Sequence, residues 1–339
     1  MEILLIYNMK TIRWGILGAG RIAGKFAADL KYVSDAELIA IGSRTKQSAD
    51  EFGKEFHIKN RHASYEALVN DPEVDVIYIA TPHNLHYENT LLCLQHNKAV
   101  LCEKPFAMNA RQTQAMIDLA REKKLFLMEA LWTKFHPHYK KLREMIGQGL
   151  LGEIRSVLIN FGFKPAPPIP ARLFDPALGG GTLMDIGIYN VFMAMSVLGK
   201  PDAIEASMTP ASTGVDEQCA ILFKYKNGAM AQLFSTFSSN LATEANISGT
   251  EGRIRLTSRF YEPSATIEYY PQYPDSREII PVEKETGFGY QYEARHVNDC
   301  LRRGFTESDV IPFADTLLLM ETLDQIRSIA GIRYTADEN

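Results

Sequence analysis

A glycine-rich turn between a strand pattern and a helix pattern constrains the fold more than any other feature of the chain. Residues 11–17 alternate and then become apolar, as buried strands do. Gly18-Ala19-Gly20-Arg21-Ile22-Ala23 follows directly, and apolar residues recur at helical spacing over 24–30. The first glycine permits a tight turn, the second lets the backbone approach a pyrophosphate, and Ala23 allows close helix–strand packing. The pattern therefore predicts a dinucleotide-binding unit, with the N–H groups at the helix start facing phosphate.

Similar strand–helix units continue through the first half of the chain. Strand patterns occur at 37–42, 74–80 and 99–102, and helix patterns at 87–97 and 110–123. Repeated units at this spacing predict an α/β Rossmann domain, in which helices cover both faces of a doubly wound parallel sheet.

The end of the second strand bears on the choice of dinucleotide. A site for NAD places Asp or Glu here to bond the ribose 2′-hydroxyl, whereas an arginine accommodates the 2′-phosphate of NADP. Ser43 and Arg44 stand at this position. We therefore expect NADP as cofactor, with NAD as the alternative, and Arg44 either stacked on the adenine or paired with the phosphate.

Polar residues follow two further strands. Thr81-Pro82 and Glu103-Lys104-Pro105 stand where the carboxyl ends of parallel strands form a ligand crevice. His83 and His86 do not predict a metal site, since no acidic or thiol ligand motif accompanies them; a packed or nicotinamide-facing role is expected for such a histidine. The residues expected to contact the cofactor are Gly18, Gly20, Arg21, Ile22, Ser43, Arg44, Thr81, Pro82, His86, Glu103 and Lys104.

The second half of the chain is rich in strand patterns. Strands are expected at 152–161, 203–209, 220–226, 229–235, 244–250, 252–257, 264–270 and 276–282, and helices at 138–148, 288–303 and 312–330. Asn227-Gly228 between two of these strands is a two-residue hairpin signal. We expect a mostly antiparallel sheet of about six strands in a C-terminal α+β domain. The expected domains are 10–131, binding NADP, and 132–339, binding substrate and forming a dimer.

Apolar pairs within the strands place hydrophobic groups on both faces of that sheet. Leu222-Phe223 and Leu233-Phe234 are two such pairs. Helices can cover one face, and we expect a partner subunit to cover the other, giving a homodimer through the C-terminal sheet.

A triple glycine precedes the most informative polar pair. Gly179-Gly180-Gly181 suits a backbone that approaches a ligand closely. Thr182 is then expected to cap a helix from Leu183 to about Leu198. Asp185 and Tyr189 are four residues apart, so they share one helix face near its amino end.

These residue types suit the oxidation of an alcohol. Hydride transfer to a nicotinamide also requires a base that removes the hydroxyl proton. A phenol ordinarily has a pKa near ~10, and a neighbouring ammonium lowers that pKa. Lys104 would supply this charge and bind the substrate oxygen, while Asp185 orients the substrate or the lysine. Trp132 and Phe161 are candidates for an apolar wall of the substrate site, and Arg172 for a substrate contact.

Several of these motifs together resemble the glucose-fructose oxidoreductase/inositol dehydrogenase/MocA (Gfo/Idh/MocA) family. They are the glycine turn at 18–23, Ala80-Thr81-Pro82, Glu103-Lys104-Pro105 and the Asp185/Tyr189 pair. The runs 129–137, 213–216 and 179–189 are similar to the branch of dimeric dihydrodiol dehydrogenases and NADP-dependent D-xylose dehydrogenases. The resemblance implies dimers and a catalytic pair of Lys104 and Tyr189, with Tyr189 moving the proton. The inositol dehydrogenase branch has histidine in place of Tyr189, which leaves Lys104 open as the proton acceptor.

Composition narrows the class of partner. The 339 residues carry a net charge of −5 and no basic run, which argues against nucleic acid or a membrane surface as partner. The four cysteines form no CxxC pair, which favours a reducing cytoplasm. Residues 1–7 are too short to span a bilayer and lack the features of a signal peptide, and Met9 is a candidate start.

The expected function is therefore an NADP-dependent dehydrogenase acting on a sugar or a vicinal diol. An inositol or polyol dehydrogenase is the alternative enzyme. A dinucleotide-binding sensor without turnover is the alternative from another class, and a sensor has no need of Lys104, Asp185 and Tyr189 as a proton relay.

Overall fold

The computed structural model describes residues 11–271 and 276–337. They form two compact units. The first contains residues up to Ala107, Arg111–Trp132 and Glu285–Leu317, and the second contains Met108–Ala110, Thr133–Lys284 and the residues from Leu318 onward. The sequence places residues 285–317 in the second domain, but they pack with the first unit.

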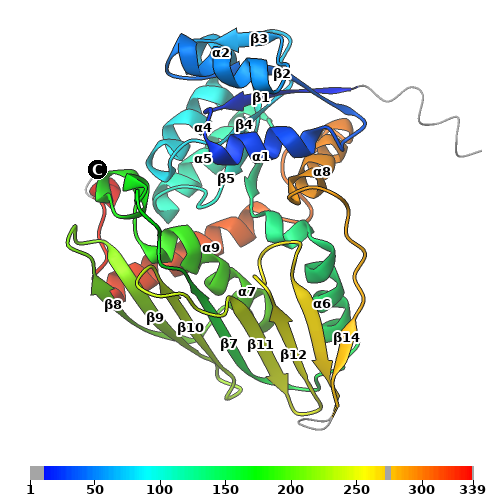
Figure 1. The fold of residues 1–339 in the computed structure, drawn as a ribbon, viewed down its shortest axis with the longest axis vertical. Coiled ribbons are helices and arrows are strands. Elements are labelled where there is room, and N and C mark those ends of the chain that lie inside the picture. The colour runs from blue at the N-terminus through cyan, green and yellow to red at the C-terminus, as the bar shows by residue number, and fades with distance from the viewer. Residues whose placement is uncertain (1–10, 272–275, 338–339) are drawn as a thin grey trace, which may run out of the picture. The chain divides into compact units, whose positions relative to one another are not determined.

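A parallel sheet forms the centre of the first unit, as the sequence predicts (Figure 1). Its six strands are β1 (Ile12–Leu17), β2 (Ala36–Gly42), β3 (Asn60–His62), β4 (Val76–Ile79), β5 (Ala99–Glu103) and β6 (Leu127–Ala130). Their order is β3-β2-β1-β4-β5-β6, and every pair is parallel. From β1 the chain adds β2 and β3 on one side, and then adds β4, β5 and β6 on the other side. Sheets of this type bind ligands where the strand order reverses, here between β1 and β4.

Six helices accompany this sheet: α1 (Arg21–Leu30), α2 (Lys46–Glu55), α3 (Tyr65–Val69), α4 (His86–Gln95), α5 (Ala110–Lys123) and α8 (Tyr290–Arg302). Helices α2 and α3 are capped by the side chains of their own N-cap residues, since Thr45 accepts from Ser48 N and Ser64 accepts from Ala67 N. Fully buried side chains of the strands, such as Ile77 and Val100, form the core.

Long-range contacts explain why α8 belongs to the first unit. The Asp29 carboxylate at the end of α1 accepts hydrogen bonds from the backbone N–H groups of Phe288, Gly289 and Tyr290. It therefore satisfies the donors at the amino end of α8, which have no partner within that helix. The Trp14 indole of β1 donates to Asn298 of α8 over 3.0 Å.

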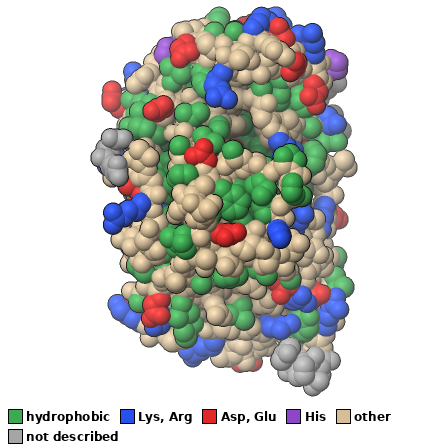
Figure 2. Space-filling view, turned by 60° about the vertical axis from the view of Figure 1, so that its left-hand side comes forward, with side chains coloured by type: hydrophobic (Ala, Val, Ile, Leu, Met, Phe, Trp, Pro, Cys, Tyr) green, Lys and Arg blue, Asp and Glu red, His purple; other side chains and the backbone are tan. Residues whose placement is uncertain are grey.

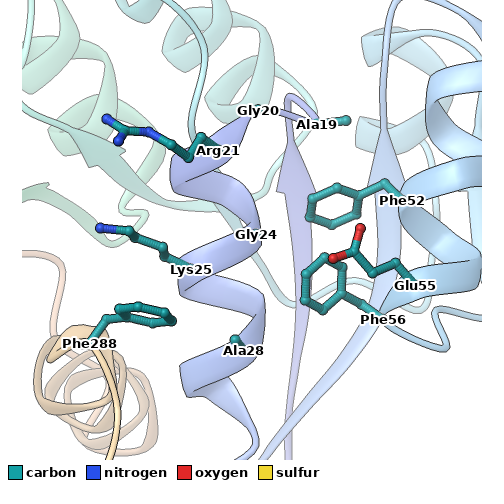
Figure 3. Close-up of a pocket in the computed structure, with 10 residues that line it drawn as sticks. All are labelled: Ala19, Gly20, Arg21, Gly24, Lys25, Ala28, Phe52, Glu55, Phe56 and Phe288. Carbon is teal, nitrogen blue, oxygen red and sulfur yellow. The ribbon is translucent and has the colours of Figure 1, made fainter. Parts of the chain in front are cut away.

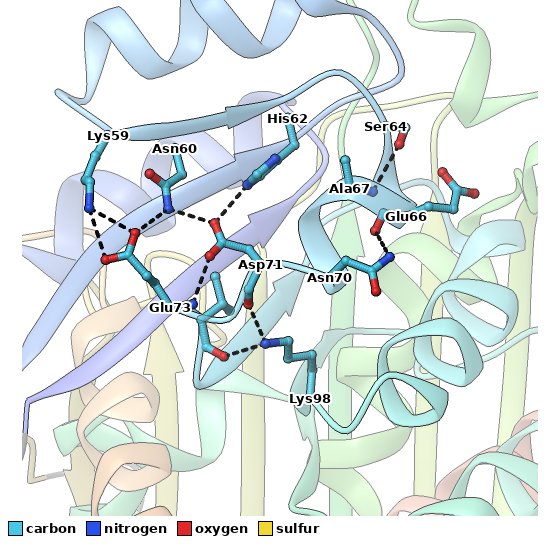
Figure 4. Close-up of polar contacts among 11 residues, drawn as sticks. Lys59, Asn60, His62, Ser64, Glu66, Ala67, Asn70, Asp71, Glu73 and Lys98 are labelled. Carbon is cyan, nitrogen blue, oxygen red and sulfur yellow. Dashed lines mark hydrogen bonds and ion pairs between the residues drawn. The ribbon is translucent and has the colours of Figure 1, made fainter.

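A polar network holds the short edge strand β3 in place (Figure 4). The Asp71 carboxylate accepts from Asn60 Nδ2 at 2.7 Å and contacts His62 Nε2 at 2.9 Å. Lys98 Nζ donates to the carbonyl oxygens of Asp71 and Val74, so it ties the same loop to the start of β5.

The second unit contains a sheet of eight strands, rather than about six. They are β7 (Ile154–Gly162), β8 (Ala203–Pro210), β9 (Asp216–Lys224), β10 (Met230–Thr236), β11 (Glu244–Gly249), β12 (Arg253–Thr257), β13 (Thr266–Tyr270) and β14 (Glu278–Ile280). Their order is β14-β13-β12-β11-β7-β10-β9-β8. The pair β7–β10 is parallel and the other pairs are antiparallel, so the expected mostly antiparallel sheet is confirmed.

The hairpin expected at Asn227-Gly228 joins β9 and β10, but its turn is longer than two residues. Lys224 pairs with Met230, and Gly228 N donates to Tyr225 O. Gly228 has φ +84°, a left-handed conformation that glycine adopts readily. This geometry is a turn followed by a bulge rather than a two-residue loop.

The remaining α-helices of the described residues are α6 (Pro137–Gly147), α7 (Ile188–Leu198) and α9 (Phe313–Ala330). Helix α7 packs on β7 and β10 and buries its first seven residues. The segment Pro176–Leu198 is long and apolar enough to cross a membrane by composition, but 72% of its apolar window is buried, as in a core helix.

Candidate active site

The glycine turn has the shape that close approach of a phosphate requires. Gly18 has φ +103°, and a Cβ there would lie 3.0 Å from the carbonyl oxygen of Ala80, so a larger residue would be strained and crowded. Gly20 precedes α1, and a Cβ at this position would meet nothing within 4 Å. The backbone at the amino end of α1 is therefore approachable from outside.

A cavity of about 510 Å³ adjoins this turn within the first unit. It is lined by Ala19, Gly20, Arg21, Gly24, Lys25, Ala28, Phe52, Glu55, Phe56 and Phe288. Figure 3 shows Arg21 and Lys25 projecting from one side of α1, with Lys25 Nζ 5.1 Å from the centre of the Phe288 ring. The sequence singled out Gly20 and Arg21 but missed Lys25, and Phe288 is too distant in sequence to be found by spacing.

The end of β2 presents one exposed cation. Ser43 is buried and its N–H donates to His62 O, whereas Arg44 is exposed. Arg44 still acts electrostatically on Tyr65: burial raises the pKa of this phenol, and the Arg44 charge opposes that rise. A backbone hydrogen bond thus fixes Ser43, and the guanidinium of Arg44 is exposed to solvent just beyond the end of β2.

His86 links the ends of β4 and β5 instead of standing at an open surface. Its Nε2 lies 2.9 Å from the carbonyl oxygen of Thr81 and its Nδ1 lies 2.8 Å from that of Pro105. Burial lowers the pKa of His86, so the ring is neutral near pH ~7 and donates to one of the two carbonyls at a time. Asn89 donates to Thr81 Oγ1, and Pro82 beside it is exposed.

Glu103 fixes the backbone that carries Lys104. The hydroxyl of Tyr78 donates to Glu103 Oε1, and Lys104 N donates to Glu103 Oε2 over 3.2 Å. Burial raises the pKa of Glu103, and the bond from Tyr78 and the charge of Lys104 oppose this rise. The peptide between Lys104 and Pro105 is cis.

In the second unit, Asp185 lies in a π-helical turn, Leu183–Gly187, that runs directly into α7. Such turns are rare and frequently occur at functional sites. Asp185 accepts from Arg172 Nη1 over 3.2 Å, so the structure brings these two expected site residues together.

Tyr189 begins a cluster of aromatic rings. Its ring centre lies 4.7 Å from that of Tyr261 and 6.2 Å from that of Phe161, and Phe161 stacks on Tyr261 at 4.5 Å. Tyr261 was not expected from the sequence, because it follows β12 in a loop without a motif. Trp132 belongs to the first unit, where it stacks on Tyr290 with 4.6 Å between the ring centres.

The triple glycine and Thr182 have structural roles that differ from those expected. Thr182 makes no capping bond; its hydroxyl donates to Asp216 Oδ2 over 2.7 Å, and the same oxygen accepts from Leu183 N. A Cβ on Gly181 would overlap Asp216 Oδ1, and one on Gly180 would lie 2.8 Å from the Asp175 nitrogen. The glycines are thus needed for packing within the unit. The cap comes from Asp216, a residue that the sequence marked only as part of a family motif.

Comparison with known proteins places these features in a family. The model described as the oxidoreductase family with an NAD-binding Rossmann fold matches residues 12–131, and a GFO/IDH/MocA C-terminal domain matches residues 139–255. Trans-1,2-dihydrobenzene-1,2-diol dehydrogenases from Homo sapiens and Mus musculus are 36% and 37% identical, each over 96% of this chain and 99% of the relative.

Solved structures agree with this assignment. A 3-ketoreductase from Actinomadura kijaniata, in complex with NADP and TDP-benzene, is 26% identical with a TM-score of 0.84, over 95% of this chain and 98% of the other. An aldose-aldose oxidoreductase from Caulobacter crescentus shares the fold, with 24% identity and a TM-score of 0.86 over the same fractions. The chain belongs to the Gfo/Idh/MocA family of oxidoreductases.

Proposed function

We propose that this protein transfers hydride between NADP and a secondary alcohol, or the corresponding carbonyl, of a sugar or a vicinal dihydrodiol. The observation that carries the proposal is the glycine turn at the end of β1, which is open at Gly20 in a chain 36% identical to dihydrodiol dehydrogenases. The relatives' names include both diol and sugar enzymes, which supports this range of substrates.

The residues of the first unit fit the dinucleotide. Gly18, Gly20 and the amino end of α1 would hold the pyrophosphate, and Arg21 and Lys25 stand beside the turn as cations. Arg44 would bind the 2′-phosphate, which makes NADP the preferred cofactor and NAD the weaker one. Thr81, Pro82, Glu103 and Lys104 would border the nicotinamide, whose chemistry is to accept or donate the hydride.

The chain itself has to manage the hydroxyl proton. We assign Tyr189 as the group that takes up this proton during oxidation and returns it during reduction. The ammonium of Lys104 stabilises the phenolate and the substrate oxygen. Asp185, paired with Arg172, orients substrate hydroxyls. Phe161 and Trp132 supply apolar surface for the ring of the substrate.

Association through the eight-stranded sheet is also part of the proposal. Leu158 of β7 and Met230 of β10 are 46% and 43% exposed, large fractions for apolar side chains in the middle of a sheet. A second copy covering this surface would form a homodimer.

We also place the protein in the cytoplasm, consistent with four buried, unpaired cysteines. Acidic and basic side chains are interspersed on the face shown in Figure 2, which favours a small-molecule substrate over nucleic acid or a membrane.

The test is reduction of NADP and of NAD with a panel of aldoses, inositols, vicinal diols and dihydrodiols, followed by nicotinamide absorbance. Turnover of a sugar or diol with NADP preferred supports the proposal. Turnover of inositols alone would favour the polyol dehydrogenase. NADP binding without turnover of any member would favour a sensor, and binding of neither dinucleotide would refute the proposal.

A further inference from the structure

Three side chains of metal-binding type converge near the end of α8, within the first unit. His296 and Cys300 are four residues apart on this helix, so they project from one face. Asp309 comes from the loop that follows. The Cys300 sulfur lies 3.4 Å from His296 Nε2, which lies 3.8 Å from Asp309 Oδ1, and the three ligand atoms all lie within 4.8 Å of one another.

The hydrogen bonds of Ser308 define the state of the His296 ring. Ser308 Oγ accepts from the backbone N–H groups of Val310 and Ile311, at 3.0 and 2.9 Å. A hydroxyl oxygen has two acceptor sites and one proton. Ser308 therefore directs its proton at His296 Nε2, 2.6 Å away. The single lone pair of Nε2 accepts this hydrogen bond, so an ion binds Nε2 only once the Ser308 hydroxyl turns away; the unprotonated nitrogen is the form of histidine that binds a metal.

The two separations that involve His296 suit a small tetrahedral ion. Zinc binds sulfur at about 2.3 Å and nitrogen or oxygen at about 2.0–2.2 Å, which places adjacent ligand atoms roughly 3.3–3.6 Å apart. The separations at His296 are close to this range. Thiolate and imidazole ligands favour zinc and cobalt over magnesium or calcium.

The cluster is open to solvent on one side. Asp309 is about half exposed, whereas Cys300 is fully buried behind it. A cavity of about 430 Å³, lined in part by Ser308 and Asp309, adjoins the cluster. An ion can therefore reach the buried sulfur from the side of Asp309, and water from the cavity can complete its coordination.

We propose that His296, Cys300 and Asp309 bind one zinc-type divalent ion, with water as the fourth ligand. The thiolate is the form of cysteine that binds a metal, so the ion displaces the proton of the Cys300 thiol to solvent as the metal–sulfur bond forms.

The ion would fasten to α8 a loop that is already bonded to the sheet. Thr306, in the same loop as Asp309, accepts a hydrogen bond from Leu127 N of β6 over 3.1 Å. A metal bond to Asp309 would hold this loop against α8 as well. None of the three ligands is a residue assigned to the dehydrogenase reaction, so the site is independent of that proposed activity.

Cobalt(II) titration of the whole protein, after treatment with a chelator, tests the proposal. We expect binding of one ion per chain, a near-ultraviolet thiolate-to-cobalt absorption band and a rise in the melting temperature. Cys300→Ala should abolish the band, whereas Cys93→Ala, at a buried cysteine on α4, should retain it.

Two further variants cover the case in which Cys300→Ala does not fold. Asp309→Asn and His296→Gln should each weaken cobalt binding roughly tenfold or more, without changing NADP affinity. The absence of a thiolate band in the unaltered protein, or its persistence in Cys300→Ala, would overturn the proposal. So would unchanged cobalt affinity in both of the other variants.

Discussion

The Thr182 hydroxyl donates a 2.7 Å hydrogen bond to the carboxylate of Asp216, and both residues are fully buried. Leu183 N donates to the same oxygen, Oδ2, whereas Oδ1 has no hydrogen-bond partner among the described residues. Burial raises the pKa of Asp216 to about 6, although the bonds from Thr182 and Leu183 oppose this rise. Burial thus favours the protonated carboxyl, whereas the two hydrogen bonds to Oδ2 favour the carboxylate.

Titration of Asp216 should make the protein less stable as the pH rises. The folded state holds this proton more tightly than the unfolded state does. The contribution of the protonated Asp216 to the free energy of unfolding is therefore lost as the pH rises from 3.8 through about 6. This shift corresponds to about 3 kcal/mol in the free energy of unfolding. Urea unfolding at about pH 5 and about pH 7 measures how far the free energy of unfolding falls between the two pH values. The fall should be smaller in Asp216→Asn, because the amide does not titrate. Asp202→Asn, at an exposed carboxyl paired with Lys226, is the control and should not remove it.

Replacement of the proposed proton acceptor should reduce turnover more than binding. We expect Tyr189→Phe to lower kcat by roughly 10²–10⁴ with little change in NADP affinity, because the hydroxyl acts on the proton and not on the cofactor. Tyr261→Phe, in the same aromatic cluster, is the matched control and should stay near the unaltered rate. Near-normal turnover of Tyr189→Phe, together with loss of turnover in Lys104→Met, would identify Lys104 as the base.

Removal of the Arg44 side chain should change the choice of cofactor. A charge-assisted bond to the 2′-phosphate is worth about 1.5–3 kcal/mol, so Arg44→Ala should weaken NADP binding roughly 10–100-fold and leave NAD nearly unaffected. Fluorescence titration with both reduced cofactors measures this ratio. Lys59→Ala, at an exposed lysine paired with Glu73, should not alter it. Equal losses for the two cofactors would assign Arg44 to the adenine instead.

A charge in the exposed apolar surface of the sheet should prevent association. Leu158→Glu places a carboxylate where we propose that the partner packs, so sedimentation at micromolar concentration should show monomers for this variant and dimers for the unaltered chain. Ile169→Glu, in the loop between β7 and α7 and 51% exposed, should stay dimeric. A monomeric unaltered chain would refute the proposed interface.

Local patterns were sufficient to predict most helices and four strands of the parallel sheet, β1, β2, β4 and β5, but they missed β3 and β6. Each strand–helix unit buries its own apolar residues, so periodicity over about ten residues carries the information. The glycine turn was predicted for the same reason, since Gly18 needs its left-handed conformation within a single turn.

Features that depend on distant residues could not be predicted in this way. Asp216 caps the turn at Leu183 from 33 positions away in sequence, so the adjacent Thr182 looked like the cap. Asp29 binds the start of α8, which joins residues 285–317 to the first unit although they follow the second sheet. Tyr261 approaches Tyr189 through the fold of a loop, and no spacing rule connects the two.

The parallel pairing of β7 with β10 has a consequence for the order in which the second sheet can assemble. Hairpins such as β9–β10 and β11–β12 join strands that are adjacent in sequence and can form as soon as both are synthesised. Strand β7 has only distant neighbours, β10 and β11, so it stays without a ladder partner until those strands exist. Contacts of this kind form slowly because a long loop has to close first. We therefore expect β7 to be inserted late, between two hairpins that are already formed.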